Sequence, residues 1–448
     1  MDFRRILAII LLSTPFAWMV GVDQFLLFLV LPLAVAGILA GPLQLDRSRR
    51  LASGLLLLVL LAVALSSVSL LQAPTFRWIT YLRDLLSVSA LVAILALQRP
   101  ARFHGEADTL VLAIVWFIFI ANAIGLIAWL TDFTIAFVSP IAQLAPTFVR
   151  ESDLGQSIFI KNILRAEPTY LFDQELPRVR SLFIYSNTYA LALGIGLPLT
   201  LYMWLRSAMR ANRVMVLVYF VSFIMCVLSM FLTASRAGMA AAMIGAAVFF
   251  WVLLGNKLTG RTRILINLSM ATIALLLVAS LFRNIDQVVY ELAYARGAGS
   301  IESRLLIYFE SIRQLFGNPI GFGTQRDAAG LGGLTLGSHS TYIAVAFKFG
   351  FLGLAAYLGF LIVLWFRIQQ GLARARVFAD REGMIFFATT AWAFTANLAH
   401  QVLAEIALDT LAFTVIVSFW LVIMLRTQRQ ISSHMARRYP DAQAAPAL

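Results

Sequence analysis

The stretch LASGLLLLVLLAVALSSVSLL, residues 51–71, decides the fold class of this chain. It contains no charged side chain and has the length of about 20 residues that a helix needs to cross a bilayer. Similar runs recur along the 448 residues, of which 61% are hydrophobic, whereas a soluble domain is about 45–50% apolar. Because an open sheet edge leaves backbone groups unpaired in lipid, the spans are expected to be helices. The sequence therefore predicts an all-α polytopic membrane protein.

The apolar runs predict twelve spanning helices. Their approximate bounds are residues 6–22, 24–41, 51–71, 76–97, 108–130, 182–205, 213–232, 236–254, 264–282, 343–366, 384–402 and 404–425. Two long connections separate these spans into three groups. The expected units are spans within 1–130, a loop at 131–181, spans within 182–282, a loop at 283–342, spans within 343–425 and a basic tail at 426–448.

Basic residues gather in alternate connections and at both ends of the chain. The clusters include Arg47, Arg49 and Arg50; Arg99 and Arg102; Arg206, Arg210 and Arg213; Lys257, Arg261 and Arg263; Arg367, Arg374, Arg376 and Arg381; and Arg4, Arg5, Arg426, Arg429, Arg437 and Arg438. The positive-inside rule places these connections and both termini in the cytoplasm. The net charge of +13 is thus a topology signal. Since no basic stripe coincides with a soluble module, we expect no nucleic-acid partner.

The two long connections contain aromatic residues and amphipathic patches, and loops of such length usually carry function. We expect them to fold together over the outer membrane face as a periplasmic helical subdomain. In the second loop, a helix-like stretch, Asp286–Tyr294, precedes an amphipathic run, Ile301–Phe316, whose apolar residues recur at helical spacing. The glycines from Gly321 to Gly337 predict a flexible coil that lets the backbone approach a ligand.

His339 is the only histidine in the two long external loops, and it lies where the glycine-rich coil meets the tenth span. An imidazole titrates near neutral pH and can accept a proton from a hydroxyl nucleophile. His339 is therefore the candidate general base. The alternative is a structural histidine that hydrogen-bonds a helix end at the membrane interface.

Arginines on the same predicted side form a second candidate group. Arg236 lies in a very tight hairpin between two spans, where an ionisable group is costly and is a functional candidate by default. Arg304 lies near the start of the amphipathic run, and Arg180 and Arg165 lie in the first loop. Guanidinium groups bind phosphate oxygens in pairs, so several at one site predict a diphosphate ligand. The alternative is snorkelling or solvated charge.

The sequence contains little support for a metal or a cofactor. The carboxylate pairs Glu151 with Asp153 and Asp173 with Glu175 offer ligands for a divalent cation, but such pairs arise by chance in polar loops. No Gly-x-x-x-x-Gly-Lys phosphate loop is present, which argues against nucleotide hydrolysis. Cys226 is the only cysteine, which excludes an intrachain disulfide and a cysteine-based metal site.

Several ionisable residues lie inside or beside the spans without an assigned role. They are Arg83 and Asp84 in the fourth span, Lys348 in the tenth, and His400, Glu405 and Asp409 around the last external link. Adjacent helical residues diverge by about 100°, so Arg83 and Asp84 need not pair with each other. The last three are either a second proton-handling group or, as we favour, helix–helix hydrogen bonds.

Three local patterns resemble the bacterial O-antigen ligase family, which is related to O-antigen polymerases. Ser235–Gly238 resembles the family's Ser-Arg-x-Gly at an outer hairpin. Arg304 followed by Asn318–Gly323 resembles its Arg…Pro-x-Gly-x-Gly segment, and Gly337–Tyr342 resembles its essential histidine motif. The family often has Asn where this chain has Ser340. The twelve spans and the large loop before the tenth also agree.

The resemblance implies a fold like that of the GT-C glycosyltransferases and transfer of O-antigen from undecaprenyl diphosphate to lipid A-core. Family members work in lipopolysaccharide biosynthesis at the periplasmic face of the inner membrane, without a metal or nucleotide cofactor. In that reading His339 is the base, and Arg236, Arg304, Arg180 and Arg165 bind the donor diphosphate. Direct displacement would invert the anomeric configuration.

Two alternatives remain open on the sequence. An O-antigen polymerase or a protein O-oligosaccharyltransferase would use the same donor with another acceptor, and the sequence contains no acceptor signature. A transporter of lipid-linked glycan is the alternative of a different class. Transporters place polar groups near the bilayer midplane in repeated halves, whereas this chain has no repeat and concentrates its polar groups outside. The oligomeric state has no signal in the sequence.

Overall fold

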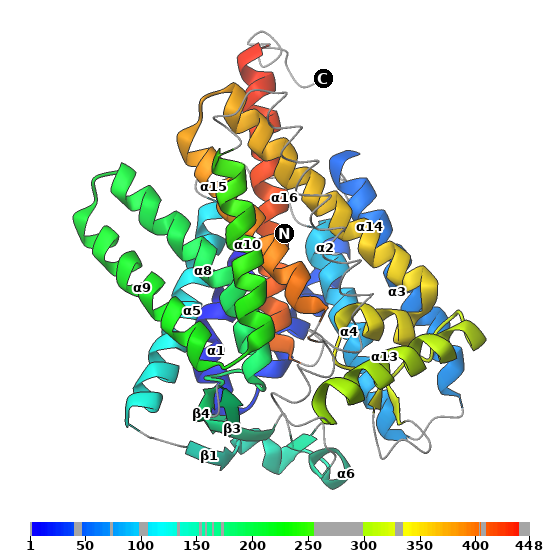
Figure 1. Cartoon of the computed structure of the whole chain (residues 1–448). Helices are drawn as coiled ribbons and strands as arrows, with labels where there is room; N and C mark the ends of the chain where they lie inside the picture. Colours follow the sequence, from blue (N-terminus) through cyan, green and yellow to red (C-terminus); the bar gives the residue numbers. More distant parts are fainter. Residues whose placement is uncertain are drawn as a thin grey trace.

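The computed structural model describes most of the chain. The described residues are 2–39, 47–71, 75–97, 106–131, 135–151, 155–156, 159–163, 165–171, 174–254, 299–327, 335–402, 404 and 409–438. The helices form a bundle whose long axes run in roughly one direction (Figure 1). The predicted ninth span, 264–282, and the helix-like stretch Asp286–Tyr294 lie outside the described residues.

The described elements follow one another as helices, with strands in the two long loops. The helices are α1 Phe3–Val20, η1 Asp23–Leu29, α2 Val30–Leu39, α3 Arg47–Ser66, η2 Ser67–Leu70, α4 Thr75–Leu97, α5 Glu106–Thr131, η3 Pro140–Leu144, α6 Thr147–Arg150, α8 Ser186–Met209, α9 Arg213–Leu232, α10 Arg236–Leu254, α13 Gly299–Gly317, α14 Thr341–Val377, α15 Arg381–Gln401 and α16 Thr410–Arg438. The strands are β1 Ile135–Val138, β2 Ile160–Ile163, β3 Arg165–Leu171, β4 Gln174–Val179, β5 Arg326–Asp327 and β6 Thr335–Leu336.

Nine helices in the described part of the chain are long and apolar enough to cross a membrane. They are α1, α3, α4, α5, α8, α9, α10, α14 and α16. The prediction of a helical, multi-pass membrane protein is therefore confirmed. The predicted second span corresponds to η1 and α2, which together form a shorter apolar segment. The count of twelve stays a prediction.

Helix α15 occupies the predicted eleventh span but is not among the nine apolar helices. Every side chain from Phe386 to Phe394 is buried, because α15 packs against α8, α10 and α14. The Trp392 indole donates a hydrogen bond to the Ala242 carbonyl of α10 over 3.0 Å. A helix surrounded by other helices can contain more polar residues than one that faces lipid. This explains why the hydropathy of α15 is lower.

Helix α14 is broken at Gly350, whose φ of 71° and ψ of −175° are not helical. A break in a helix leaves carbonyl groups without their usual partners. Here the amides of Phe322 and Gly323 donate to the carbonyls of Phe347 and Lys348, each over 2.8 Å. The segment that follows α13 is therefore docked into the break of a spanning helix.

The prediction of a flexible glycine coil is wrong for the described glycines. Gly321 has a φ of 93°, and a side chain there would overlap the Gly350 amide. Gly337 has a φ of 71°, and a side chain there would overlap the Phe347 ring. These glycines are required by left-handed backbone and close packing. They allow this segment to pack closely against α14, next to the loop that contains His339.

The described part of the first long loop forms strands, which corrects the expected helical subdomain. Two antiparallel hairpins, β1–β2 and β3–β4, lie there with only short helical turns. Pro168 and Pro177 fall at the irregularity in the register between Ala166 and Thr169. Proline disrupts a helix interior but is accommodated at such a bulge. The sequence of this loop is therefore better suited to hairpins than to helices.

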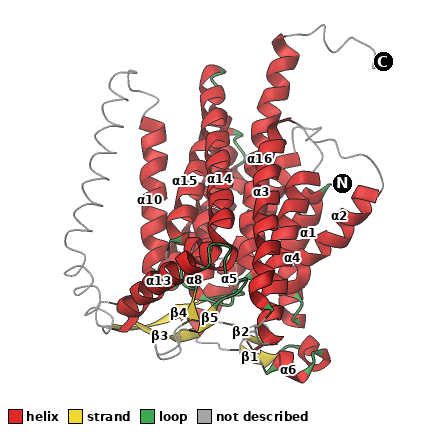
Figure 2. Cartoon of the chain, turned by 90° about the vertical axis from the view of Figure 1, so that its right-hand side faces the viewer, coloured by secondary structure: helices red, strands yellow, loops and turns green. Residues whose placement is uncertain are grey.

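The first loop docks on the turn between α1 and η1. Gly21 has a φ of 94°, and a side chain at this position would overlap Ser139 of the loop. Lys161 of β2 forms a buried ion pair with Asp23 of η1. The hairpins and α13 consequently lie at one end of the bundle, away from the start of α1 and the C-terminal half of α16 (Figure 2).

Candidate functional site

His339 projects from a loop that is anchored on both sides. Its φ of 63° lies in the left-handed region, which few residues other than glycine adopt. Before it, the Ser338 hydroxyl donates to the Thr335 carbonyl over 2.6 Å. After it, the Thr341 amide donates to the Ala404 carbonyl over 3.1 Å. The His339 side chain is exposed although Ser338 is buried, so the imidazole is presented at the surface.

Helix α13 brings a cation to this imidazole. The Tyr308 hydroxyl donates to the His339 carbonyl over 3.1 Å and lies 3.4 Å from the Val402 carbonyl. Arg304 precedes Tyr308 by one helical turn and therefore lies on the same face of α13. The prediction that Arg304 lies near the start of a helix is confirmed. The structure thus places Arg304 and His339 in one site.

The surroundings of His339 favour its neutral form. Partial burial and then the positive charge of Arg304 lower the pKa of His339 below its ordinary value of 6.5. A neutral imidazole keeps a nitrogen lone pair free at neutral pH. The site can therefore accept a proton from a hydroxyl group.

The hairpin between α9 and α10 determines where Arg236 lies. The Ser235 hydroxyl accepts a hydrogen bond from the Gly238 amide over 3.1 Å, as expected of a helix N-cap. Gly238 packs closely against Ala190 of α8. Arg236 is the first residue of α10 and is half-buried. The Ser235–Gly238 motif therefore presents a guanidinium group at the end of the membrane span.

Arg178 attaches this hairpin to the first loop. Its guanidinium donates to the Thr233 carbonyl over 3.2 Å and to the Asn187 side chain over 3.0 Å. Because α10 and α15 pack together, the start of α10 and the end of α15 lie at the same end of the bundle. The α15 end contacts the His339 loop, since the Ser340 hydroxyl lies 3.4 Å from the Gln401 carbonyl. Arg236 and His339 therefore share one end of the bundle.

Arg165 and Arg180 lie at the same end of the β3–β4 hairpin. This hairpin belongs to a different part of the face from the His339 loop. Arg165 begins β3, opposite Val179 of β4, one residue before Arg180. Arg180 donates to the Ile184 carbonyl over 3.1 Å and lines a separate pocket. Burial lowers the pKa of Arg180. The predicted gathering of all four arginines with His339 is thus shown only for Arg304.

Three ionisable residues inside the bundle form a buried cluster. Arg83 and Asp84, which need not pair on helical geometry alone, do pair, with 3.1 Å between Nη2 and Oδ1. The flexible arginine side chain bridges the angular separation. Lys348 of α14 donates to the other Asp84 oxygen over 3.0 Å. Buried charges need such partners, so the cluster ties α4 to α14 close to its break.

Asp409 makes the inter-helix hydrogen bonds expected of the last external link. Its Oδ2 accepts from the Ile184 amide over 3.0 Å and from the Thr188 hydroxyl over 2.8 Å. His400 is buried in α15, and among the described residues its Nε2 has no partner. The predicted acidic residues that lie outside the described part of the chain are Glu405, Asp153 and Asp173. No group of three or more His, Cys, Asp or Glu in the described ranges is placed to hold a metal ion.

The apolar stripe predicted on α13 is exposed rather than packed into the bundle. Phe309, Ile312 and Phe316 are all exposed, whereas Ile307 and Leu315 are buried. The periodicity correctly predicts the helix but does not show which apolar residues contact the bundle. The periodicity also gives no indication that Tyr308 contacts the His339 loop. Its position four residues after Arg304 is the signal that would have placed it on the inner face.

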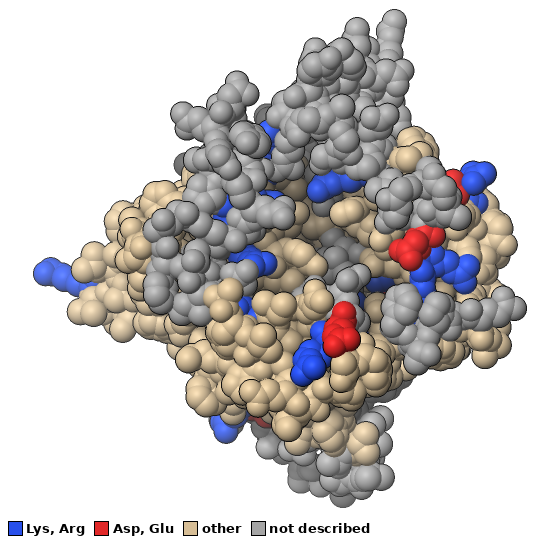
Figure 3. All heavy atoms as spheres, turned by 90° about the horizontal axis from the view of Figure 1, so that it is seen from below, with Lys and Arg blue, Asp and Glu red and all other residues tan. Residues whose placement is uncertain are grey.

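Figure 3 shows this end of the bundle in space-filling form. Lys and Arg side chains lie around a hollow near the middle of the face, and the few visible Asp and Glu side chains lie next to basic ones. Such a surface attracts anions more than cations. This end of the bundle can therefore attract a negatively charged group.

The family model described as O-antigen ligase matches residues 220–358. This part of the chain is similar to the O-antigen ligase family. The matched segment includes Arg236, Arg304 and His339, whereas Arg165 and Arg180 lie before it. The resemblance stated from the sequence is thus confirmed. No curated protein matches the chain.

Proposed function

We propose that this protein is an O-antigen ligase that transfers O-antigen glycan from undecaprenyl diphosphate to a sugar of lipid A-core. The reaction would take place at the periplasmic face of the bacterial inner membrane, with both termini in the cytoplasm. One observation carries the proposal: Arg304 lies beside His339 within the segment that matches the family. This pairing combines a phosphate-binding cation with a proton acceptor.

In the proposed reaction, His339 accepts the proton of the acceptor hydroxyl while the hydroxyl oxygen attacks the anomeric carbon. The bond between that carbon and the diphosphate oxygen breaks, and its electron pair remains on the diphosphate. Attack from the face opposite the leaving group inverts the anomeric configuration. Base catalysis of this kind contributes roughly 10²- to 10⁴-fold to a rate. A lowered pKa suits His339 to this role because the base must be unprotonated.

The leaving diphosphate gains negative charge as it departs. Arg304 and Arg236 are proposed to neutralise this charge, whereas Arg180 lines a separate pocket. Fixed cations that face a developing charge can replace a metal ion, and we propose that the reaction is independent of metals and cofactors. Activity that is lost in EDTA and restored by magnesium would contradict this part of the proposal.

The orientation of α13 supports a lipid-linked donor. The centroid of the exposed Phe316 ring lies 5.6 Å from that of Phe351 in α14. The apolar face of α13 therefore continues the exposed apolar surface of a spanning helix. An amphipathic helix with such a face lies in the membrane interface. Arg304 and Tyr308 then lie at the depth of the headgroups, where a membrane-anchored diphosphate is located.

The acceptor distinguishes the proposed ligase from its relatives. Purified protein in lipid nanodiscs would be incubated with undecaprenyl-diphosphate glycan and, in separate reactions, lipid A-core, a second donor molecule or a pilin-like protein. Ligation to lipid A-core is the expected product. Chain extension would identify a polymerase, and glycosylated protein would identify a protein O-oligosaccharyltransferase. Movement of intact donor across the bilayer without any product would instead support a transporter.

A further inference from the structure

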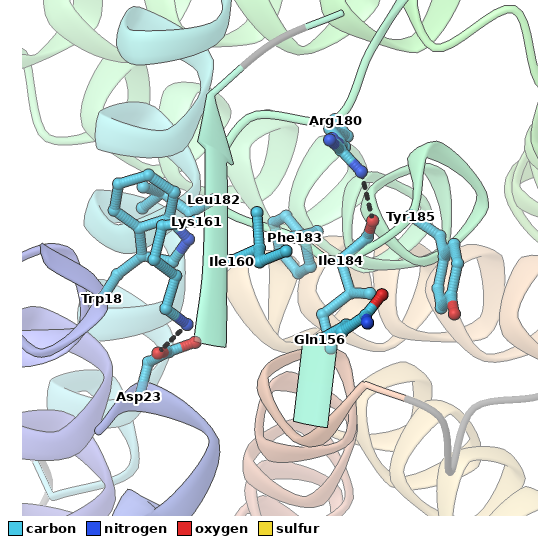
Figure 4. Close-up of a pocket in the computed structure, with 10 residues that line it drawn as sticks. All are labelled: Trp18, Asp23, Gln156, Ile160, Lys161, Arg180, Leu182, Phe183, Ile184 and Tyr185. Carbon is cyan, nitrogen blue, oxygen red and sulfur yellow. Dashed lines mark hydrogen bonds and ion pairs between the residues drawn. The ribbon is translucent and has the colours of Figure 1, made fainter. Parts of the chain in front are cut away.

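A pocket opens on the same face, in a part of the chain that the proposed reaction does not need. It has a volume of about 260 Å³ and is formed where the end of α1, the start of η1, β2 and residues 180–185 meet (Figure 4). This is below the roughly 300–1,000 Å³ of pockets for drug-sized ligands. The volume suits a small polar unit such as one sugar ring.

Among the described residues, the pocket contains one cation without a counter-ion. Lys161 is neutralised by Asp23, and the exposed fractions of their side chains are 4% and 0%. Arg180, in contrast, donates only to the neutral Ile184 carbonyl, and within the described residues its buried Nε has no partner. A desolvated guanidinium is stabilised by an anion that supplies the missing charge and acceptors. The pocket therefore favours a ligand with one negative group.

The mouth of the pocket is amphipathic. Tyr185 and Ile160 are 44% and 46% exposed and border the opening together with the exposed Gln156 (Figure 4). An aromatic ring offers an apolar face at low entropic cost, while an amide supplies both a donor and an acceptor. A sugar presents the complementary surfaces, because its ring has an apolar face of C–H groups and an edge of hydroxyl groups. These features select a saccharide over a simple inorganic anion.

One segment of chain separates the pocket from His339. Ile184, whose carbonyl holds Arg180, donates its amide to Asp409 over 3.0 Å. Asp409 and Ala404 belong to the same link between α15 and α16, and Ala404 accepts the Thr341 amide beside His339. A glycan held at Arg180 would thus lie on the same face of the protein as the proposed transfer site.

We propose that this pocket binds an acidic saccharide, with a carboxylate or phosphate on Arg180 and the sugar ring against Tyr185. The saccharide belongs either to the acceptor or to the glycan of the donor. This assignment rests on the proposed function, which supplies both substrates. It concerns recognition of the sugar and not of the lipid-linked diphosphate. Arg180 therefore selects substrate and has no part in bond breaking.

Direct binding tests the pocket without requiring turnover. Lipid-free acidic core oligosaccharide, and the same oligosaccharide after removal of its charged groups, would be titrated into the full protein in nanodiscs by saturation-transfer NMR. Wild type should bind the acidic form about tenfold more tightly. Arg180→Gln should lose this preference, and Tyr185→Ala should weaken both forms. Arg150→Gln, an exposed arginine of the same loop outside the pocket, is the matched control and should bind as wild type does.

Two outcomes would overturn the inference: equal binding of the acidic and neutral forms by wild type, or an unchanged preference in Arg180→Gln. Transfer assays identify the source of the sugar, because Arg180→Gln should raise KM for the acceptor in one case and for the glycan donor in the other. If wild type binds the acidic saccharide but catalyses no transfer, the proposed function fails and the pocket stands. If transfer is normal and Arg180→Gln alters neither binding nor KM, the pocket fails and the function stands.

Discussion

The Tyr308 hydroxyl donates to the main-chain carbonyl of His339 over 3.1 Å, joining the inner face of α13 to the loop that presents the imidazole. The bond also positions Arg304, one turn earlier, beside His339. Burial raises the pKa of Tyr308, so its hydroxyl remains a donor at neutral pH. The cation and the base therefore depend on the same contact for their mutual placement.

Replacing Tyr308 by Phe removes this bond and keeps the ring. A hydrogen bond contributes about 0.5–1.5 kcal/mol, so kcat should fall by roughly 3- to 10-fold. The pH midpoint of the reaction should also move, because Arg304 would be held less closely to His339. Leu306→Ala, an exposed position of the same helix, is the control. An unchanged kcat and an unchanged pH midpoint in Tyr308→Phe would show that the contact does not position the site.

His339→Ala should lower kcat by roughly 10²- to 10⁴-fold while donor binding is retained. His339→Gly should be as inactive but at least as stable as the alanine variant, because a φ of 63° suits glycine. Added imidazole should restore part of the activity of the glycine variant. His434→Ala, a histidine at the other end of α16, should remain active. Full turnover by His339→Ala would remove the base assignment.

The pH dependence of kcat/KM should reflect the lowered pKa of His339. Activity requires the neutral imidazole, so it should rise with pH through a midpoint below 6.5. Arg304→Gln removes the charge that contributes to the shift and should move this midpoint upward. Arg313→Gln is the control, since Arg313 lies on the same helix, is exposed and pairs with Glu310. The same pKa shift makes the free energy of unfolding depend on pH. Between the lowered pKa of folded His339 and 6.5, the unfolded chain binds more protons than the folded protein. The stability that neutral His339 contributes is therefore present above pH 6.5 and is lost as the pH falls through the lowered pKa.

Arg236→Ala and Arg304→Ala should each reduce donor turnover by roughly 10²- to 10³-fold, because each removes a cation from the departing diphosphate. Arg236→Lys should recover only part of the rate, since an ammonium group lacks the planar fork of arginine. Arg213→Ala, an exposed arginine at the other end of α9, should have no effect on donor affinity or rate. The diphosphate site is refuted if both alanine variants bind and use donor as wild type does.

Gly350→Ala should destabilise the protein by about 2 kcal/mol or more and lower its apparent Tm. An alanine there would adopt an unfavourable left-handed φ of 71° and overlap the Pro319 carbonyl. Gly54→Ala in α3 is the matched control, because an added methyl group at Gly54 meets nothing. Thermal unfolding in detergent, followed by light scattering, measures both variants. Equal melting temperatures would show that the break in α14 does not depend on glycine.

Local patterns were sufficient to predict most spanning helices, the helix of α13 and the resemblance of part of the chain to the O-antigen ligase family. Runs of apolar residues and helical periodicity are properties of neighbouring positions, and these decide where a helix begins and ends. They could not show that Phe309 of α13 is exposed while Ile307 is buried, because both positions are apolar. Nor could they show that Arg180 lines a pocket of its own.

By itself, the sequence determined a multi-pass helical membrane protein and the set of basic and histidine side chains available for chemistry. Only the tertiary structure decided that Arg304 lies close enough to His339 to affect its charge, that Gly321 fits the break in α14 and that the first loop forms hairpins. These relations join residues far apart in the chain. Such contacts are set by how helices and loops pack against one another, which no short stretch of sequence encodes.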